Sequence, residues 1–344
     1  MKKAPVRESF FLSGSEVKPG SRQLLNLPMP DLSSHAGMNM PVHVIHGRQP
    51  GPVLFVSAAI HGDELNGVEI IRRLLATKAI STLKGTLIAV PVVNPYGLIQ
   101  VSRYLPDRRD LNRAFPGSDN GSLAARLARL FMTEIVSVST HGIDLHTGSG
   151  HRTNLPQIRA NLDDPETDRL ARRFGVPVLL NAAVRDGSLR GSASDMGIPI
   201  LLYEAGEALR YNDLAIRAGV KGIINVMRTL GMLKELRVSS KRQPDPFVAR
   251  SSRWLRAPTS GMFKSAVKLG AQVTKGDIVG HIASASEGSR HGIRSPHSGV
   301  VIGRMELPLV HEGDAVLHLA RFKGDIDEVA DHVESFQLDH TDDE

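Results

Sequence analysis

Apolar and polar positions follow two alternating patterns between residues 40 and 235. Residues 52–60, PVLFVSAAI, form a continuous apolar run, which is typical of a strand buried on both faces of a parallel sheet. In residues 64–80 apolar side chains recur at helical spacing, so this segment predicts a helix. The same patterns predict further strands at 85–94, 142–146, 176–182 and 198–204, and further helices at about 122–138, at 163–175 and up to about 235. Such alternation predicts an α/β domain with a mixed, mostly parallel sheet and helices on both faces.

The pattern changes near residue 240, where the stretch SSKRQPDPF is rich in serine, proline and charge and predicts a linker over 241–255. An internal repeat follows, with APTSGMF and VTKGDIVGHI in its first half and SPHSGVV and VHEGDAVLHL in its second. The repeat predicts a small all-β domain over 256–324, which resembles the barrel-sandwich hybrid of lipoyl and biotinyl domains but lacks their carrier lysine. We therefore expect a catalytic domain over 1–240 with an N-terminal β extension over 1–50, the linker, the β domain, and a solvated acidic tail over 325–344.

Composition narrows the chemistry that the chain can perform. The 344 residues include no cysteine, so disulfides and thiolate metal sites are excluded and a metal would need His, Asp or Glu ligands. The 42 basic and 36 acidic residues give a net charge of +6, but arginines and acids are mixed along the chain and only 4% of residues are aromatic. We therefore expect small anionic substrates and no nucleic acid.

The sequence contains no recognisable targeting or membrane segment. Pro5, Arg7 and Glu8 interrupt the first 14 residues, which would otherwise have to form the apolar part of a secretion signal. No stretch approaches the roughly 18 apolar residues of a membrane span. These features predict a soluble, cytoplasmic protein without a membrane partner, which could form a homo-oligomer.

Three polar residues stand where predicted strands end, and these ends meet at one rim of the sheet. His61 follows 52–60, His146 ends 142–146 and Glu204 ends 198–204. Glu64 lies one helical turn after His61, and Gly62 permits a sharp turn between them. Two imidazoles and a carboxylate, with a fourth position left to water, form the ligand set of a catalytic zinc site. The sequence therefore predicts one zinc ion per chain at this rim.

The residues near the predicted zinc site could also have other roles. A lone His-x-x-Glu motif often arises by chance, and Asp63 could compete as a ligand or cap the next helix. Asp144 could orient His146 through the free ring nitrogen or simply form a hydrogen bond at the sheet edge. The run EAGE offers Glu207 as a competitor of Glu204.

Residues 95–117 lack periodicity but are rich in fixed charges, and a connection of this length in a compact domain is usually functional or disordered. Arginines near a zinc rim can bind a substrate carboxylate or stabilise the oxyanion formed when water adds to a carbonyl. For Arg108 and Arg109 we expect an exposed, solvated position.

Four motifs occur in a fixed order: HGDE, SRYLPDRRDLNRAFPG, DLHTG and YEAG. Together they resemble the succinylglutamate desuccinylase/aspartoacylase family, distant relatives of carboxypeptidase A, over roughly residues 40 to 235. The resemblance implies a zinc carboxypeptidase-like fold and a zinc amidohydrolase. His61, Glu64 and His146 would be the ligands, and Glu204 would be the general base.

The resemblance also assigns roles in the charged connection. Arg103 would polarise the scissile carbonyl, and Asn112 and Arg113 would hold the substrate carboxylate. The implied reaction is hydrolysis of the amide bond of an N-acyl amino acid, of the deacetylase or desuccinylase type, by a metal-activated water.

Substrate identity stays open at this stage. Aspartoacylase-like members use a further arginine for an acidic side chain, and Arg152 and Arg159 are the candidates here. The appended β domain resembles the branch that includes acetyl-diaminobutyrate deacetylases, which leaves a neutral or basic amino acid open. Two alternatives remain: a zinc carboxypeptidase acting on peptides, and a non-catalytic binding module.

Overall fold

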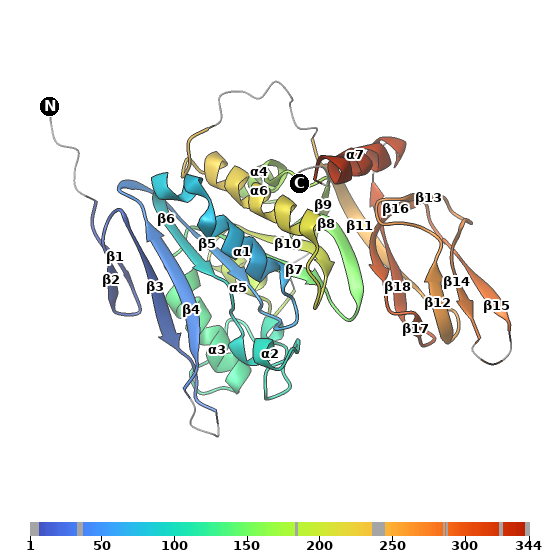
Figure 1. The fold of residues 1–344 in the computed structure, drawn as a ribbon, viewed down its shortest axis with the longest axis horizontal. Coiled ribbons are helices and arrows are strands. Elements are labelled where there is room, and N and C mark those ends of the chain that lie inside the picture. The colour runs from blue at the N-terminus through green and yellow to red at the C-terminus, as the bar shows by residue number, and fades with distance from the viewer. Residues whose placement is uncertain are drawn as a thin grey trace.

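The computed structural model describes residues 7–32, 37–182, 185–235, 245–284, 286, 288–322 and 326–340, and it contains a twelve-stranded mixed sheet (Figure 1). In spatial order the strands are β13 (Gln272–Val273), β16 (Gly299–Met305), β18 (Ala315–Phe322), β11 (Phe247–Arg256), β9 (Val178–Asn181), β8 (Arg152–Ala160), β10 (Ile200–Glu207), β7 (His141–Gly148), β5 (Gln49–Ala58), β6 (Lys84–Val90), β4 (Asn39–His46) and β3 (Ser21–Pro28). The strands β6, β5, β7 and β10 run parallel, as do β8, β9 and β11, whereas the other pairs are antiparallel. The predicted mixed α/β fold is confirmed.

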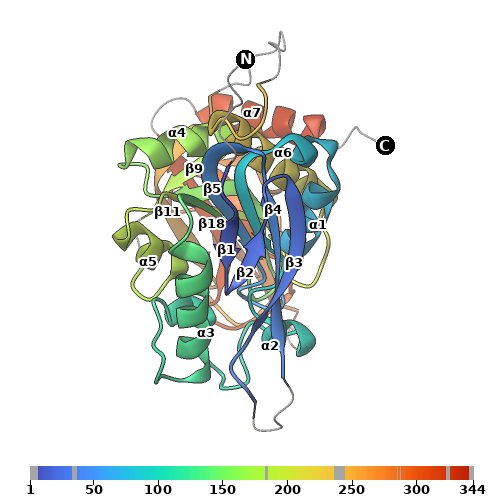
Figure 2. The ribbon, with the colours of Figure 1, turned by 90° about the vertical axis from the view of Figure 1, so that its left-hand side faces the viewer.

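Helices cover both faces of the parallel strands (Figure 2). One face carries α1 (Asn66–Ala76), α4 (Pro165–Phe174) and α6 (Asp213–Thr229), and the other carries α2 (Pro95–Ile99), α3 (Leu123–Phe131) and α5 (Leu189–Asp195). The alternation along β5 shows why two cores form. Leu54 and Val56 point into the first core, and Phe55 points into the second. A continuous apolar run is therefore needed to bury both faces of this strand.

Shorter elements complete this part of the chain. The 3-10 helix η1 (Lys78–Thr82) follows α1, and the 3-10 helix η2 (Leu111–Arg113) lies within the charged connection of residues 95–117. The π-helical turn η3 (Met132–Val136) continues α3. A small hairpin of β1 (Phe10–Leu12) and β2 (Ser15–Val17) packs against the second core.

The C-terminal strands are part of the main sheet. The pairs β8–β9, β9–β11, β11–β18, β18–β16 and β16–β8 close a five-stranded barrel around side chains that include Leu155, Val178 and Ile302. Residues 247–255 were expected in a linker and instead belong to β11, whereas 241–244 lie outside the described residues. The sequence of β11 hides the strand because its serines and arginines resemble those of a linker. The structure identifies this segment as a strand because it pairs with β9 and β18.

The two halves of the internal repeat form two similar sets of strands. The second sheet has the order β15 (Arg290–Arg294), β14 (Ile278–Ala283), β12 (Gly261–Ser265) and β17 (Leu309–Val310). The short strand of each half pairs with a strand of the other half. β17 of the second half pairs with β12, and β13 of the first half pairs with β16. A third apolar core lies between the halves.

The expected solvated tail over 325–344 is wrong for most of its length. Helix α7 (Ile326–Asp339) buries Val329, Val333 and Phe336, and the Arg217 side chain donates a hydrogen bond to the His340 carbonyl at 2.8 Å. The acidic residues gave the segment a solvated character, but its apolar residues have helical spacing and pack on the domain. Residues 325 and 341–344 lie outside the described part. Among the described helices, none combines the length and apolarity needed to cross a membrane.

Candidate active site

His61, Glu64 and His146 form a buried cluster beyond the ends of β5 and β7. The ligand atoms of the three side chains lie within 4.8 Å of one another. Glu64 Oε1 accepts a hydrogen bond from His61 Nδ1 at 2.7 Å, and Glu64 Oε2 accepts one from His146 Nδ1 at 2.8 Å. The structure therefore brings together the three residues predicted as metal ligands.

A second pair of carboxylates faces the outer nitrogens of the two imidazoles. Asp110 Oδ1 lies 3.1 Å from His61 Nε2, and Asp144 Oδ2 lies 2.7 Å from His146 Nε2. Asp144 also accepts a hydrogen bond from the Ser57 hydroxyl at 2.8 Å, which fixes its orientation. Of the two explanations for Asp144, the geometry supports the one in which it orients His146. Asp110 was not singled out in the sequence because it reaches the site only through the fold of the charged connection.

Each imidazole thus lies between two carboxylates, and this controls its charge. Burial alone would lower the pKa of His61 and of His146, but the carboxylates raise it, for His146 well above the ordinary value. Burial would raise the pKa of Glu64, yet the two histidines hold it well below its usual range. The cluster therefore favours positive charge between carboxylates.

This donor set fits a divalent metal such as zinc. Ring nitrogens and a carboxylate are zinc ligands, and metal-binding histidines commonly donate their other N–H to a carboxylate. Here Asp110 and Asp144 occupy that outer position. Because a coordinating ring nitrogen must be deprotonated, metal binding would displace protons from these imidazoles.

The turn after β5 explains how His61 and Glu64 meet. The Glu64 amide donates to the His61 carbonyl at 3.2 Å, closing a tight turn before α1. A Cβ at Gly62 would overlap the backbone of Gly97, so only glycine fits here. Thr147 N donates to Glu64 Oε2 at 3.0 Å and ties the carboxylate to β7.

A cavity of about 350 Å³ opens above the cluster, and all of the predicted site residues line it. Arg103 donates to Asp110 Oδ2 at 2.9 Å and lies 3.3 Å from Glu64 Oε1, which places its guanidinium beside the candidate metal position. The Asn112 side-chain oxygen accepts a hydrogen bond from Leu189 N at 2.9 Å, and Asn112 lines the cavity. Arg113 also lines the cavity, and its side chain donates to the Asn112 carbonyl.

Glu204 stands beside His146 in the register of β10 and β7. Its Oε2 accepts a hydrogen bond from Asn154 Nδ2 at 2.8 Å and pairs with Arg159 Nε at 3.3 Å. Both contacts involve the same carboxylate oxygen. The competitor Glu207 instead approaches His151 and Arg210, and it is not among the residues that line the cavity.

The cavity wall also includes residues from distant parts of the chain. Arg152 and Arg159, whose position was open from the sequence, both line it. The Arg152 guanidinium lies over the Trp254 ring, with 5.3 Å between Cζ and the ring centroid, and its Nε donates to the Ala315 carbonyl at 3.1 Å. Trp254 in turn stacks on His318 with the ring centroids 4.5 Å apart. Burial, with a smaller effect from Arg159, lowers the pKa of His318 to about 3, so this imidazole is neutral.

Sequence reasoning missed Trp254, Ser188, Arg185 and Arg190 as lining residues. No local signal marks them. Trp254 lies on β11, in the segment expected as a linker, and the pairing of β11 with β9 and β18 brings it to the site.

The chain is similar to known proteins in sequence and in fold. A sequence model of the succinylglutamate desuccinylase/aspartoacylase catalytic domain matches residues 50–230. The chain is 26% identical over 332 residues to the N-alpha-acetyl-L-2,4-diaminobutyric acid deacetylase of Halomonas elongata, covering 92% of this chain and 95% of that protein. It is also 34% identical over 113 residues to the succinylglutamate desuccinylase of Pseudomonas aeruginosa, covering 30% of this chain and 33% of that protein.

Solved structures show the same fold. A succinylglutamate desuccinylase/aspartoacylase from Rhodobacter sphaeroides superposes with a TM-score of 0.80 at 24% identity, covering 93% of this chain and 97% of that one. The product-bound ectoine utilization protein from Ruegeria pomeroyi gives a TM-score of 0.78 at 24% identity, covering 92% and 97%.

Proposed function

Since the chain belongs to the succinylglutamate desuccinylase/aspartoacylase family, we propose that it is a zinc-dependent hydrolase that cleaves the amide bond of an N-acyl amino acid. The observation that carries this proposal is the buried His61, Glu64 and His146 cluster with Glu204 on the same cavity wall. A metal-ligand set and a separate carboxylate base together are what metal-assisted hydrolysis of an amide uses.

Bound zinc would supply a Lewis acid and lower the pKa of a coordinated water to about 7. The free oxygen of Glu204 accepts the proton of the attacking water and later delivers it to the departing amine. Asn154 and Arg159 hold the other oxygen of Glu204. Arg103 stabilises the negative charge that develops on the carbonyl oxygen, because its guanidinium lies beside Glu64.

The α-carboxylate of the substrate is placed at Asn112 and Arg113. Asn112 lines the cavity and would donate through its NH2 group, since its oxygen already accepts from Leu189 N, and Arg113 would add a fixed positive charge. An amide and a guanidinium together suit the geometry of a carboxylate.

The charge of the cavity restricts which side chain the amino-acid part of the substrate can carry. Six arginines line it, against the two carboxylates of Glu64 and Glu204. The Arg152 side chain donates to the backbone carbonyls of Ala315 and Ser149 and stacks on Trp254, so neutral partners hold it in place. A cationic side chain, such as the free amine of diaminobutyrate, would be repelled here. We therefore favour N-acyl amino acids that carry a second carboxylate.

The test combines metal analysis with a substrate panel. Protein purified without added metal is analysed for zinc, and amine release is measured from acetyl and succinyl derivatives of acidic, neutral and basic amino acids and from a dipeptide with a free C-terminus. About one zinc per chain and release that stops on chelation and returns with zinc would support the proposal. Cleavage of the dipeptide alone would favour a carboxypeptidase. Failure to bind zinc on reconstitution would remove the metal site.

A further inference from the structure

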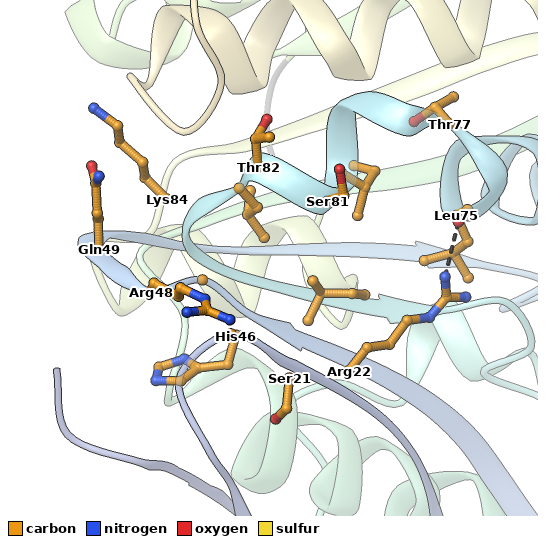
Figure 3. A pocket seen from close by; sticks show the side chains of 15 residues that line it. Ser21, Arg22, His46, Arg48, Gln49, Leu75, Thr77, Ser81, Thr82 and Lys84 are labelled. Atoms are coloured by element: carbon orange, nitrogen blue, oxygen red, sulfur yellow. Dashed lines mark hydrogen bonds between the residues drawn. The ribbon is translucent and has the colours of Figure 1, made fainter. Parts of the chain in front are cut away.

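A larger cavity, of about 590 Å³, lies at the amino end of β5, away from the candidate active site (Figure 3). Arg22, Arg48 and Lys84 line it, but Figure 3 shows their charged ends pointing in different directions, with Arg22 turned toward Leu75. These three cations do not define one binding point. At the candidate active site, in contrast, Arg152 belongs to a series of ring contacts that leads into the barrel.

The series follows a row of paired residues across the barrel wall. Trp254 of β11 pairs with His318 of β18. His318 also pairs with Gly303 of β16, and Gly303 pairs with Asn154 of β8. Directly paired residues of antiparallel strands project from the same face of the sheet, with their Cβ atoms about 5 Å apart. The strand register therefore places His318 beside the indole.

His318 contacts the indole through a parallel stack. The ring centroids lie 4.5 Å apart, and the ring planes differ by 9°. Gly303 leaves the space for this stack, since a Cβ there would come within 3.1 Å of the His318 Cβ and within 3.4 Å of the indole. His318 is 3% exposed, and within the described part of the chain its Nδ1 has no hydrogen-bond partner. The stack is therefore the contact through which His318 can restrict its neighbour.

The same indole contacts Arg152 at the cavity wall. The Arg152 Cζ lies 5.3 Å from the centroid of the Trp254 ring, and its Nε donates to the Ala315 carbonyl at 3.1 Å. Ala315 and His318 both belong to β18. One strand therefore supplies both the carbonyl that holds the guanidinium and the ring that holds the indole.

The charge of His318 suits this arrangement. Burial, with a smaller effect from Arg159, lowers the pKa of His318 to about 3, so the imidazole is neutral near pH 7. The negative face of an indole attracts a cation. A neutral imidazole leaves that attraction to Arg152, whereas a charged imidazole in the same stack would repel the guanidinium.

We propose that His318 is a positioning residue that sets the affinity of the candidate active site for the second carboxylate of its substrate. The imidazole fixes the indole of Trp254, and the indole and the Ala315 carbonyl together direct the Arg152 guanidinium. The position requires a flat, uncharged ring and no hydrogen bond from it. This inference rests on the proposed function, because it assumes that Arg152 receives the second carboxylate.

The test uses the fluorescence of Trp254, which is the only tryptophan of the chain. Emission is titrated with N-acetylglutamate and with N-acetylglutamine, which differ only in the second carboxylate. Every protein is loaded with zinc and carries Glu204→Gln, so that the ligands are not consumed. His318→Leu removes the flat ring, and His318→Phe keeps a flat, neutral ring.

His332→Leu is the matched control. This histidine of α7 contacts the Phe247 ring with the ring centroids 5.5 Å apart, and it does not line the cavity of the candidate active site. The control therefore removes an imidazole that contacts an aromatic ring of the barrel without touching the stack on Trp254.

We expect the protein with His318, His318→Phe and His332→Leu each to bind N-acetylglutamate about tenfold more tightly than N-acetylglutamine, the scale of one hydrogen bond between charged groups. His318→Leu should lose most of this preference, and its tryptophan emission should shift because the indole is no longer stacked. Partial unfolding would weaken the binding of both ligands equally. The ratio of the two affinities therefore distinguishes positioning from a purely structural role.

An unchanged ratio in His318→Leu, or a His318→Phe protein that behaves like His318→Leu, would overturn the positioning role. Equal binding of the two ligands by the protein with His318 would also overturn it, because Arg152 would then not receive the second carboxylate. Neither result decides whether the chain is a hydrolase. Amine release by the protein with Glu204 intact tests that separately.

Discussion

Replacing Glu204 by glutamine separates proton transfer from metal binding. The amide is nearly isosteric, and its oxygen can still accept the hydrogen bond from Asn154 that holds the carboxylate now. It cannot take a proton from water at neutral pH. We expect kcat to fall by about 100-fold or more, which corresponds to about 2.7 kcal/mol of activation free energy, while zinc content stays at the wild-type level.

The structure indicates that the fold tolerates this change. The side chains of Glu204 and Arg159 are 18% and 25% exposed, so weakening their pair costs at most about 1 kcal/mol of unfolding free energy. A typical domain retains its fold after such a loss. The assay is initial-rate kinetics on the best N-acyl substrate, with zinc content and thermal unfolding measured on the same preparation.

Glu207→Gln is the matched control, because this second carboxylate of EAGE contacts His151 and Arg210 and does not line the cavity. We expect its kcat to stay within about twofold of wild type. If E204Q loses zinc together with rate, Glu204 acts as a ligand and the assignment as base is refuted. If E207Q is the variant that loses rate, the two carboxylates have been assigned the wrong way round.

Four further substitutions test the cavity wall and the fold. Arg152→Gln and Trp254→Leu should each raise KM at least tenfold for an N-acyl amino acid with a second carboxylate, with kcat within about threefold of wild type. For a substrate without that carboxylate, KM and kcat should both stay close to the wild-type values. Glu69, whose pKa is lowered to about 2 by two neighbouring arginines, contributes stability above pH 4.5 that is lost as pH falls through about 2. In urea unfolding, Glu69→Gln should therefore cost about 1 to 2 kcal/mol at pH 7 and progressively less as pH approaches 2; a pH-independent cost would contradict this reasoning. Phe336→Ala should cost about 3 kcal/mol in the same assay, because this ring is buried; a loss below about 0.5 kcal/mol would mean that α7 does not pack as described.

Local sequence patterns predicted the metal-ligand cluster because strand ends and turns are local features. His61 and His146 each follow an apolar run, and neighbouring parallel strands place their carboxyl ends at one edge. The pairing of β5 with β7 meets that condition. Asp110 could not be found in this way, because the connection that holds it has no period. Its position follows from contacts with Arg103 and His61 that form only in the folded chain.

The C-terminal part shows a different limit of sequence reasoning. The repeat correctly indicated β structure, but strand patterns do not specify which strands will pair. The closure of β16 onto β8 joins segments more than 140 residues apart and converts an appended β unit into part of the catalytic sheet. The linker was wrong over residues 247–255, and the solvated tail was wrong over residues 326–339, for a related reason. Serine, proline and charged residues indicate that one face of a segment is exposed. They do not show which element packs against its other face.

This closure bears directly on the proposed reaction. Arg152 lies on β8, and the indole beneath it comes from β11, so the stack exists only when the five-stranded barrel is closed. Gly303 of β16 permits that contact, because a Cβ there would come within 2.9 Å of the Asn154 side chain and 3.4 Å of Trp254. Asn154 is also the residue that holds Glu204. The barrel therefore supports the candidate base and Arg152 at once, so the C-terminal strands contribute to the candidate active site.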